Sequence, residues 1–157
     1  MTRTPILASL VLAFGLIAAP ALAACTAPAG AKALMAEARD QINSYRSAAG
    51  LGALALNTNL SKAAQDHACD MSRMGKLSHV GANGSDLVAR LKRIGYAFRA
   101  ANENVGKFNQ TAAAKWWYGS PGHRANMLSL KINEVGLGVV QGADRQFYWV
   151  MVGGARR

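Results

Sequence analysis

The chain has 157 residues, a length typical of one domain, and 18 Lys and Arg against 8 Asp and Glu give a formal net charge of +10. The basic residues are scattered, with no basic helix face and no interleaved aromatic run, which argues against nucleic-acid binding. The charge favours association with anionic envelope polymers or lipid headgroups, or reflects only a solvated basic surface.

Residues 1–24 have the parts of a secretory signal peptide. Arg3 precedes an apolar run over residues 6–19, and small residues follow at 21–23. The run is too short for a stable membrane anchor, and no other segment approaches transmembrane length. We therefore expect an exported domain over residues 25–157, secreted or periplasmic. A buried N-terminal helix is the alternative interpretation.

The chain has two cysteines, Cys25 and Cys69. Export permits a disulfide, and two is the smallest number that can pair within one chain. The bridge would attach the start of the mature chain to the helix that contains Cys69. Residues 22–25 also resemble a lipoprotein cleavage box, which predicts instead an acylated Cys25 that anchors the protein and an unpaired Cys69.

Two amphipathic helices are predicted in the first half of the mature chain. Apolar side chains recur every three or four residues over 31–49, and Gly50 ends that helix. The second helix is capped by Thr58 or Asn59 and continues to Met74.

His67 lies on the apolar stripe of the second helix. A histidine in that position is more often a hydrogen-bonded core residue than a ligand. The connector before this helix holds Leu54 and Leu56 in alternation, and no strand is predicted there.

A helix, a strand and another helix are predicted in the middle of the chain. Ser85 caps the helix over residues 86–94. A strand covers 98–108, and a fourth helix covers 110–117, starting at its first or second residue.

A short helix over residues 121–128 has His123 in its first turn. Ser120 is its N-cap, and Pro121 fits the first helical position, where a missing N–H costs nothing. The positive end of a helix disfavours imidazolium, so we expect a neutral His123 that can bind a metal or accept a proton. The alternative is a ring that only packs beside the neighbouring tryptophans.

The end of the chain has the pattern of a β-hairpin. Strands over 135–140 and 146–152 flank a Gly-Ala-Asp turn at 142–144. Helices followed by a terminal hairpin and one inner strand predict an α+β or three-layer α/β/α arrangement.

Five motifs, in this order, resemble the CAP superfamily, which includes cysteine-rich secretory proteins, venom antigens, plant pathogenesis-related proteins and bacterial secreted proteins. The motifs are Asn43-Ser44-Tyr45-Arg46, Ser78-His79, Asn102-Glu103-Asn104, Ser120-Pro121-Gly122-His123-Arg124 and Asn133-Glu134-Val135-Gly136-Leu137-Gly138. The resemblance extends over about 34–153 and implies an α/β/α sandwich with a small central antiparallel sheet.

The resemblance also implies a central cleft formed by His79, Glu103 and His123, matched motif by motif. Well-studied eukaryotic members have a second glutamate shortly after the family's tryptophan. Here residues 117–120 read Trp-Tyr-Gly-Ser, so that carboxylate is absent. A mechanism that requires a pair of carboxylates is therefore not expected.

Two imidazoles and one carboxylate could hold a divalent cation with open positions, and zinc suits imidazole ligands. His79 and His123 are then the expected metal ligands. The alternative is a buried polar network in which Glu103 orients both rings through hydrogen bonds. For Glu134 we expect a structural hydrogen bond rather than a catalytic role.

Three functions fit these features. The leading hypothesis is a monomeric, exported binding module for a sterol, another lipid or an envelope polymer, with metal-modulated binding. The alternative is a metal-dependent hydrolase acting on peptide, glycan or lipid ester, with Glu103 as general base. The third is an interaction scaffold that displays loops such as 81–85.

A nucleophilic hydrolase is not expected. Ser78 and Ser120 lie close in sequence to histidines, but neighbours on one segment seldom meet in attack geometry, and no Gly-x-Ser-x-Gly elbow is present. Cys69 lies in the middle of a helix, which argues against a thiol nucleophile.

Overall fold

The computed structural model describes residues 25–108 and 112–157, so the predicted signal peptide and the start of the predicted fourth helix lie outside the described residues. The elements in chain order are α1 (Ala31–Ala48), β1 (Ala55–Leu56), α2 (Thr58–Met74), α3 (Leu87–Arg93), β2 (Phe98–Phe108), α4 (Ala113–Gly119), α5 (Pro121–Met127), β3 (Glu134–Gln141) and β4 (Phe147–Arg156). Within the described ranges, no helix is both long and apolar enough to cross a membrane.

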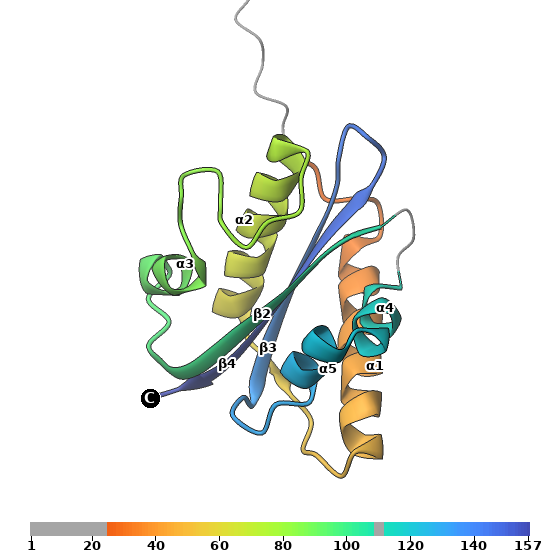
Figure 1. Cartoon of the computed structure of the whole chain (residues 1–157), viewed down its shortest axis with the longest axis vertical. Helices are drawn as coiled ribbons and strands as arrows, with labels where there is room; N and C mark the ends of the chain where they lie inside the picture. Colours follow the sequence, from red (N-terminus) through yellow and green to blue (C-terminus); the bar gives the residue numbers. More distant parts are fainter. Residues whose placement is uncertain (1–24, 109–111) are drawn as a thin grey trace, which may run out of the picture.

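The molecule has three layers, as the α/β/α prediction requires (Figure 1). A four-stranded sheet lies between α2 and α3 on one face and α1, α4 and α5 on the other. The protein is therefore of the α+β class. This layering gives the sheet two separate apolar cores, one on each face.

The strands are ordered β1-β3-β4-β2, so β2 lies at one edge of the sheet. The pairs β3–β4 and β4–β2 are antiparallel, as predicted, while β1 pairs in parallel with β3 over two residues. The predicted end of β4 at residue 152 is wrong. The strand continues to Arg156 because its last residues pair with the start of β2, where Phe98 is opposite Arg156.

The two cores follow from the alternation of side chains along β4. Tyr148, Val150 and Val152 belong to the core beneath α2, whereas Trp149 and Met151 belong to the core beneath α1. Residues 148–152 of this central strand form an uninterrupted apolar run and are thus buried on both faces.

Helix α2 lies unusually close to β3 because two positions of the strand lack side chains. A Cβ atom added at Gly136 would overlap the backbone of Leu60 and Ser61, and one at Gly138 would overlap the backbone of Ala64. Glycine permits this contact between backbones. These two glycines of the last motif therefore fix the spacing of α2 and the sheet.

The predicted cap of α2, Thr58 or Asn59, is wrong by one or two residues. Asn57 is the N-cap, and its Oδ1 accepts a hydrogen bond from the backbone N–H of Leu60 at 3.0 Å. An amide oxygen in extended backbone just before the helix satisfies an N–H that the helix itself leaves unpaired.

The predicted cap of α3, Ser85, is also wrong. Asp86 is the N-cap, and its Oδ1 accepts a hydrogen bond from the N–H of Ala89 at 2.8 Å.

Helix α4 extends beyond the predicted end at Trp117 to Gly119, and α5 follows after the single residue Ser120.

The predicted disulfide is confirmed: Cys25 and Cys69 are bonded, with Cα atoms 5.6 Å apart. The bridge attaches the first described residue to the middle of α2. The lipoprotein alternative requires a free sulfur on Cys25, and in this structure that sulfur is part of the bridge.

Loss of the disulfide is expected to destabilise the fold by about 4 kcal/mol, because the bridge closes a loop with a sequence separation of 44. The experiment is urea unfolding of the mature protein with and without a phosphine reductant, with the Cys25→Ala/Cys69→Ala variant as the matched control. The reduced protein and the variant should unfold at the same, lower urea midpoint. An unchanged midpoint after reduction, verified by mass, would contradict the expectation.

Candidate functional site

His79 lies in the loop between α2 and α3, above the middle of β2. Its side chain is 62% exposed, and its Nδ1 is 2.9 Å from Oε1 of Glu103. The Glu103 side chain is only 4% exposed, so the ring covers a buried carboxylate. This hydrogen bond is the main reason that the pKa of His79 is raised above 6.5. The structure thus brings together two of the three predicted site residues.

Arg90, on the inner side of α3, holds the other carboxylate oxygen. Its Nη2 donates to Oε2 of Glu103 at 2.6 Å, and both side chains are buried. Its Nη1 donates to the backbone carbonyls of Ser85 at 2.8 Å and His79 at 3.2 Å. One guanidinium therefore orients the carboxylate and fixes the loop that presents His79.

Arg90 is a site residue that the sequence analysis missed, because it was counted among the scattered basic residues. A signal was available. Arg90 lies with Leu87, Leu91 and Ile94 on the helix face that points inward. A charged residue on an apolar stripe indicates a buried partner, since an unpaired buried charge is costly.

His67 has the structural role that its position on the apolar stripe predicted. The ring is fully buried in α2, and its Nε2–H donates to the carbonyl of Ser78 at 2.8 Å. Burial lowers the pKa of His67, while the Glu103 carboxylate, 3.9 Å from Nε2, opposes that shift. His67 thus acts as a neutral support for the loop before His79.

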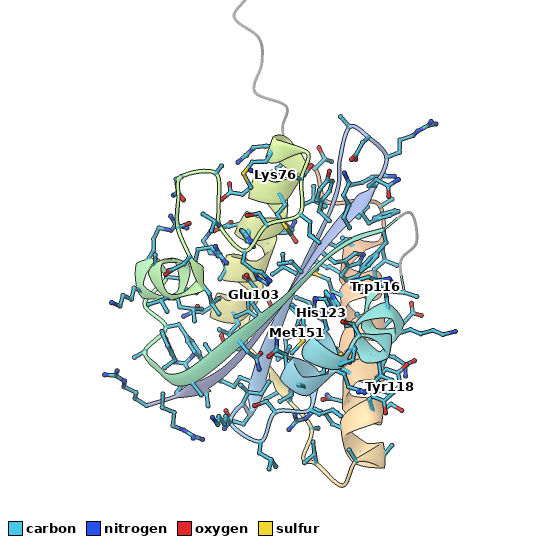
Figure 2. All side chains as sticks on the ribbon, in the orientation of Figure 1. Lys76, Glu103, Trp116, Tyr118, His123 and Met151 are labelled. Carbon is cyan, nitrogen blue, oxygen red and sulfur yellow. A yellow bond between two sulfur atoms is a disulfide. The ribbon has the colours of Figure 1, made fainter. Side chains whose placement is uncertain are left out.

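His123 lies in the first turn of α5, on the other side of β2 from Glu103 (Figure 2). Its Nδ1 is 2.9 Å from the hydroxyl of Ser120, and its ring centre is 5.4 Å from that of Trp116. The pKa of His123 is lowered, as the predicted neutral ring requires. Burial is the main cause, and the nearby charge of His79 adds to it.

The contact between Ser120 and His123 corrects two predictions. Ser120 occupies the N-cap position, but its hydroxyl bonds the imidazole instead of capping a backbone N–H. The expectation that neighbouring Ser and His side chains do not meet is wrong here, because one helical turn brings positions i and i+3 together. Among the described residues, the other nitrogen of His123 has no hydrogen-bonding partner, so no third group completes a triad.

Asn104 on β2 and Asn126 on α5 attach the helix to the strand. The Asn104 side chain donates to the carbonyl of His123 at 2.9 Å, and the Asn126 side chain donates to Oδ1 of Asn104 and to the carbonyl of Glu103. Because side chains alternate along a strand, Glu103 points to the α3 side while Asn104 points to α5. His79 and His123 therefore approach from opposite layers across the edge strand.

The alternative in which Glu103 orients both rings is wrong. Within the described chain, no hydrogen bond or ion pair joins Glu103 to His123; Glu103 orients His79, and Ser120 orients His123. The predicted structural role of Glu134 is confirmed. It starts β3 and accepts hydrogen bonds from the side chains of Asn57 and Tyr96.

The two rings are arranged as imidazole ligands of a metal usually are. Each uses Nδ1 for a hydrogen bond to a neighbouring side chain, and within the described residues neither Nε2 has a hydrogen-bonding partner. Both oxygens of Glu103 are already used by His79 and Arg90. In the described part of the chain, no three His, Cys, Asp or Glu side chains are grouped closely enough to hold an ion.

A model described as the CAP, cysteine-rich secretory protein family, matches residues 39–152. The uncharacterized protein YkwD of Bacillus subtilis is 29% identical over 118 residues, which are 74% of this chain and 46% of that protein. The uncharacterized membrane protein YlbC of the same species is 31% identical over 112 residues, or 69% of this chain and 31% of that protein. The chain spans less than half the length of either relative.

Solved structures share the fold. An outer surface protein of Borrelia burgdorferi superposes with a TM-score of 0.74 at 19% identity, over 80% of this chain and 95% of that one. An extracellular protein of Bacillus anthracis that contains an SCP domain gives a TM-score of 0.69 at 26% identity, over 80% of this chain and 41% of that one.

Removal of Arg90 is expected to cost far more stability than removal of a surface arginine. Arg90→Met leaves the Glu103 carboxylate buried without its cation, and breaking such a pair costs about 3–5 kcal/mol. Arg93→Met is the matched control, because Arg93 is exposed on the same helix. Urea unfolding of both variants measures the difference, and equal losses would contradict it.

The three histidines should titrate in a defined order in proton NMR of the imidazole rings. The midpoint of His79 should lie above 6.5 because Glu103 favours its charged form, and those of His67 and His123 should lie below 6.5 because burial disfavours theirs. A His79 midpoint below either of the others would refute this order.

The same shifts have opposite effects on stability. A lowered pKa means that the unfolded chain binds the proton first, so the fold loses the contributions of His67 and His123 as the pH falls below about 6.5. His79 stabilises the fold below about 6.5 and loses this contribution as the pH rises through its raised pKa.

Proposed function

Because the chain belongs to the cysteine-rich secretory protein (CAP) family, we propose that the mature protein is an exported binding module whose cleft at His79, Glu103 and His123 takes an envelope lipid or polymer together with a divalent cation. The observation on which this proposal rests is the pair of oriented imidazoles. Each ring is held at Nδ1 by a different partner, Glu103 or Ser120, and each leaves Nε2 available. Bound between them, zinc would supply positive charge for oxygen atoms of a ligand.

The surroundings of the two rings support binding of an amphiphilic ligand. Leu77 and Val80, on either side of His79, are exposed, and so is Trp116 beside His123. Apolar side chains next to polar nitrogens favour a ligand that has both kinds of surface.

The burial and the hydrogen bonds of Glu103 favour a binding function over a hydrolytic one. A general base must lie within hydrogen-bonding reach of a proton of a water or substrate. The carboxylate is buried beneath His79, and its two oxygens already accept hydrogen bonds from His79 and Arg90. Its contacts therefore support a positioning role, in which it orients His79 as a carboxylate orients a metal-binding imidazole.

The proposed location follows from the signal-peptide pattern, the disulfide and the relatives. A disulfide persists in oxidising compartments. The similar protein of Bacillus anthracis is extracellular, and that of Borrelia burgdorferi is an outer surface protein. A net charge of +10 suits a surface of anionic lipids or polymers.

Zinc calorimetry of the mature protein tests the cation component. We expect one zinc ion per chain, at least tenfold weaker binding in His79→Ala and in His123→Ala, and roughly tenfold weaker binding in Ser120→Ala, which frees the His123 ring. Ser129→Ala, an exchange of a serine whose hydroxyl bonds only the nearby N–H of Lys131, is the matched control and should bind zinc normally. Unchanged affinity in both histidine variants would remove the cation from the proposal.

Cosedimentation with anionic lipid vesicles and with isolated cell-wall material tests the ligand component. Binding to either, reduced in the histidine variants, would support the proposal. Turnover of envelope material that disappears in Glu103→Gln would replace it with the hydrolase alternative.

A further inference from the structure

A surface hollow of about 570 Å³ lies against α4, next to the cleft. It is lined by Ala112, Lys115, Trp116, Gly119 and Ser120 and is open to solvent. It adjoins the cleft directly, because Trp116 contacts the His123 ring and the hydroxyl of Ser120 bonds His123. A ligand that fills the hollow would therefore reach the cleft.

Trp116 is an exposed aromatic surface with a fixed orientation. Its side chain is 50% exposed, although Trp117 and Trp149 are fully buried. The rings of Phe108 and His123 contact Trp116 with centre distances of 4.8 Å and 5.4 Å, both tilted by about 50°. Two ring neighbours leave the indole little freedom, so a ligand that stacks on its open face loses little entropy in ordering it.

The rest of the lining is small or polar. Ala112 has a short side chain, and a Cβ added at Gly119 would meet no atom within 4 Å. Lys115 and Ser120 supply hydrogen-bonding groups, and none of the described residues of the lining has a carboxylate. By contrast, the hollow between α1 and β1 is lined by Met35, Leu56 and Leu137 and suits an acyl chain better. The Trp116 hollow combines one flat apolar surface with polar edges.

We infer that this hollow binds a β-1,4-linked glycan strand with sugars of the gluco configuration. In such sugars the hydroxyl groups are equatorial, so the axial C–H groups form a flat apolar face while the ring edge is polar. One sugar would stack its C–H face on Trp116 and direct its edge to Lys115 and Ser120. The inference rests on the proposed binding function and specifies its polymer as a glycan.

Chitotetraose and cellotetraose are the probes, and α-linked maltotetraose is the comparison. Because the other two tryptophans are buried, acrylamide quenching of tryptophan fluorescence reports mainly on Trp116. Bound chitotetraose should protect the fluorescence from quenching, and maltotetraose should bind more weakly because its linkage turns successive sugar faces away from the indole. Cellotetraose lacks the acetamido groups of chitotetraose. Comparison of the two affinities therefore separates the contribution of the sugar rings from that of the acetamido groups.

Calorimetry of variants locates the site. Trp116→Ala should weaken chitotetraose binding by about tenfold or more, and Trp116→Phe by less, because a smaller aromatic face remains. Gly119→Leu should abolish chitotetraose binding, because the leucine side chain fills the hollow while the Trp116 indole is retained. The matched control is Leu130→Ala, the loss of an apolar side chain that is 82% exposed elsewhere on the surface.

Absence of both quenching protection and binding heat with chitotetraose and cellotetraose overturns the inference, as does equal affinity in Trp116→Ala and Leu130→Ala. The titrations are done with and without a chelator, so the two proposals can fail separately. Loss of zinc binding with retained oligosaccharide binding removes the cation and keeps the glycan site. Zinc binding without oligosaccharide binding removes the glycan site alone.

Discussion

The buried ion pair of Arg90 and Glu103 is the constraint on which the rest of the site depends. Both side chains are removed from water where α3 and β2 meet, so each charge must be satisfied within the protein. Nη1 of Arg90 donates to the carbonyls of Ser85 and His79, and the other oxygen of Glu103 accepts from the His79 ring. The carbonyls and the His79 ring that hydrogen-bond this ion pair therefore also fix the shape of the loop and the orientation of the imidazole.

The edge position of β2 explains why the pKa values of His79 and His123 shift in opposite directions. Its alternating side chains support one layer through Glu103 and the other through Asn104, so His79 and His123 reach the same edge from opposite faces. A buried carboxylate raises the pKa of His79, whereas burial and the charge of His79 lower that of His123. The pKa of His79 therefore favours its charged form, and that of His123 favours its neutral form.

Much of the fold could be predicted from local sequence patterns. The periodicity of residues 31–49 located α1, the glycine after Met74 located the end of α2, and the turn at 142–144 located the hairpin. The strand β1 could not be predicted, because its two residues pair with Glu134 and Val135, far away in the chain. Both helix caps were displaced by one or two residues, since several adjacent side chains could each serve as a cap and only backbone geometry selects one.

The sequence by itself determined the family motifs and the structural role of His67, because apolar periodicity and residue chemistry are local properties, but it left a disulfide and an acylated Cys25 as alternatives. Only the tertiary structure decided which groups touch. It showed that Glu103 bonds His79 and Arg90 but not His123, and that Ser120 holds the second ring. The physical reason is that burial and helix periodicity can be inferred from neighbours in sequence, whereas the partner of a buried charge is fixed by the packing of distant elements.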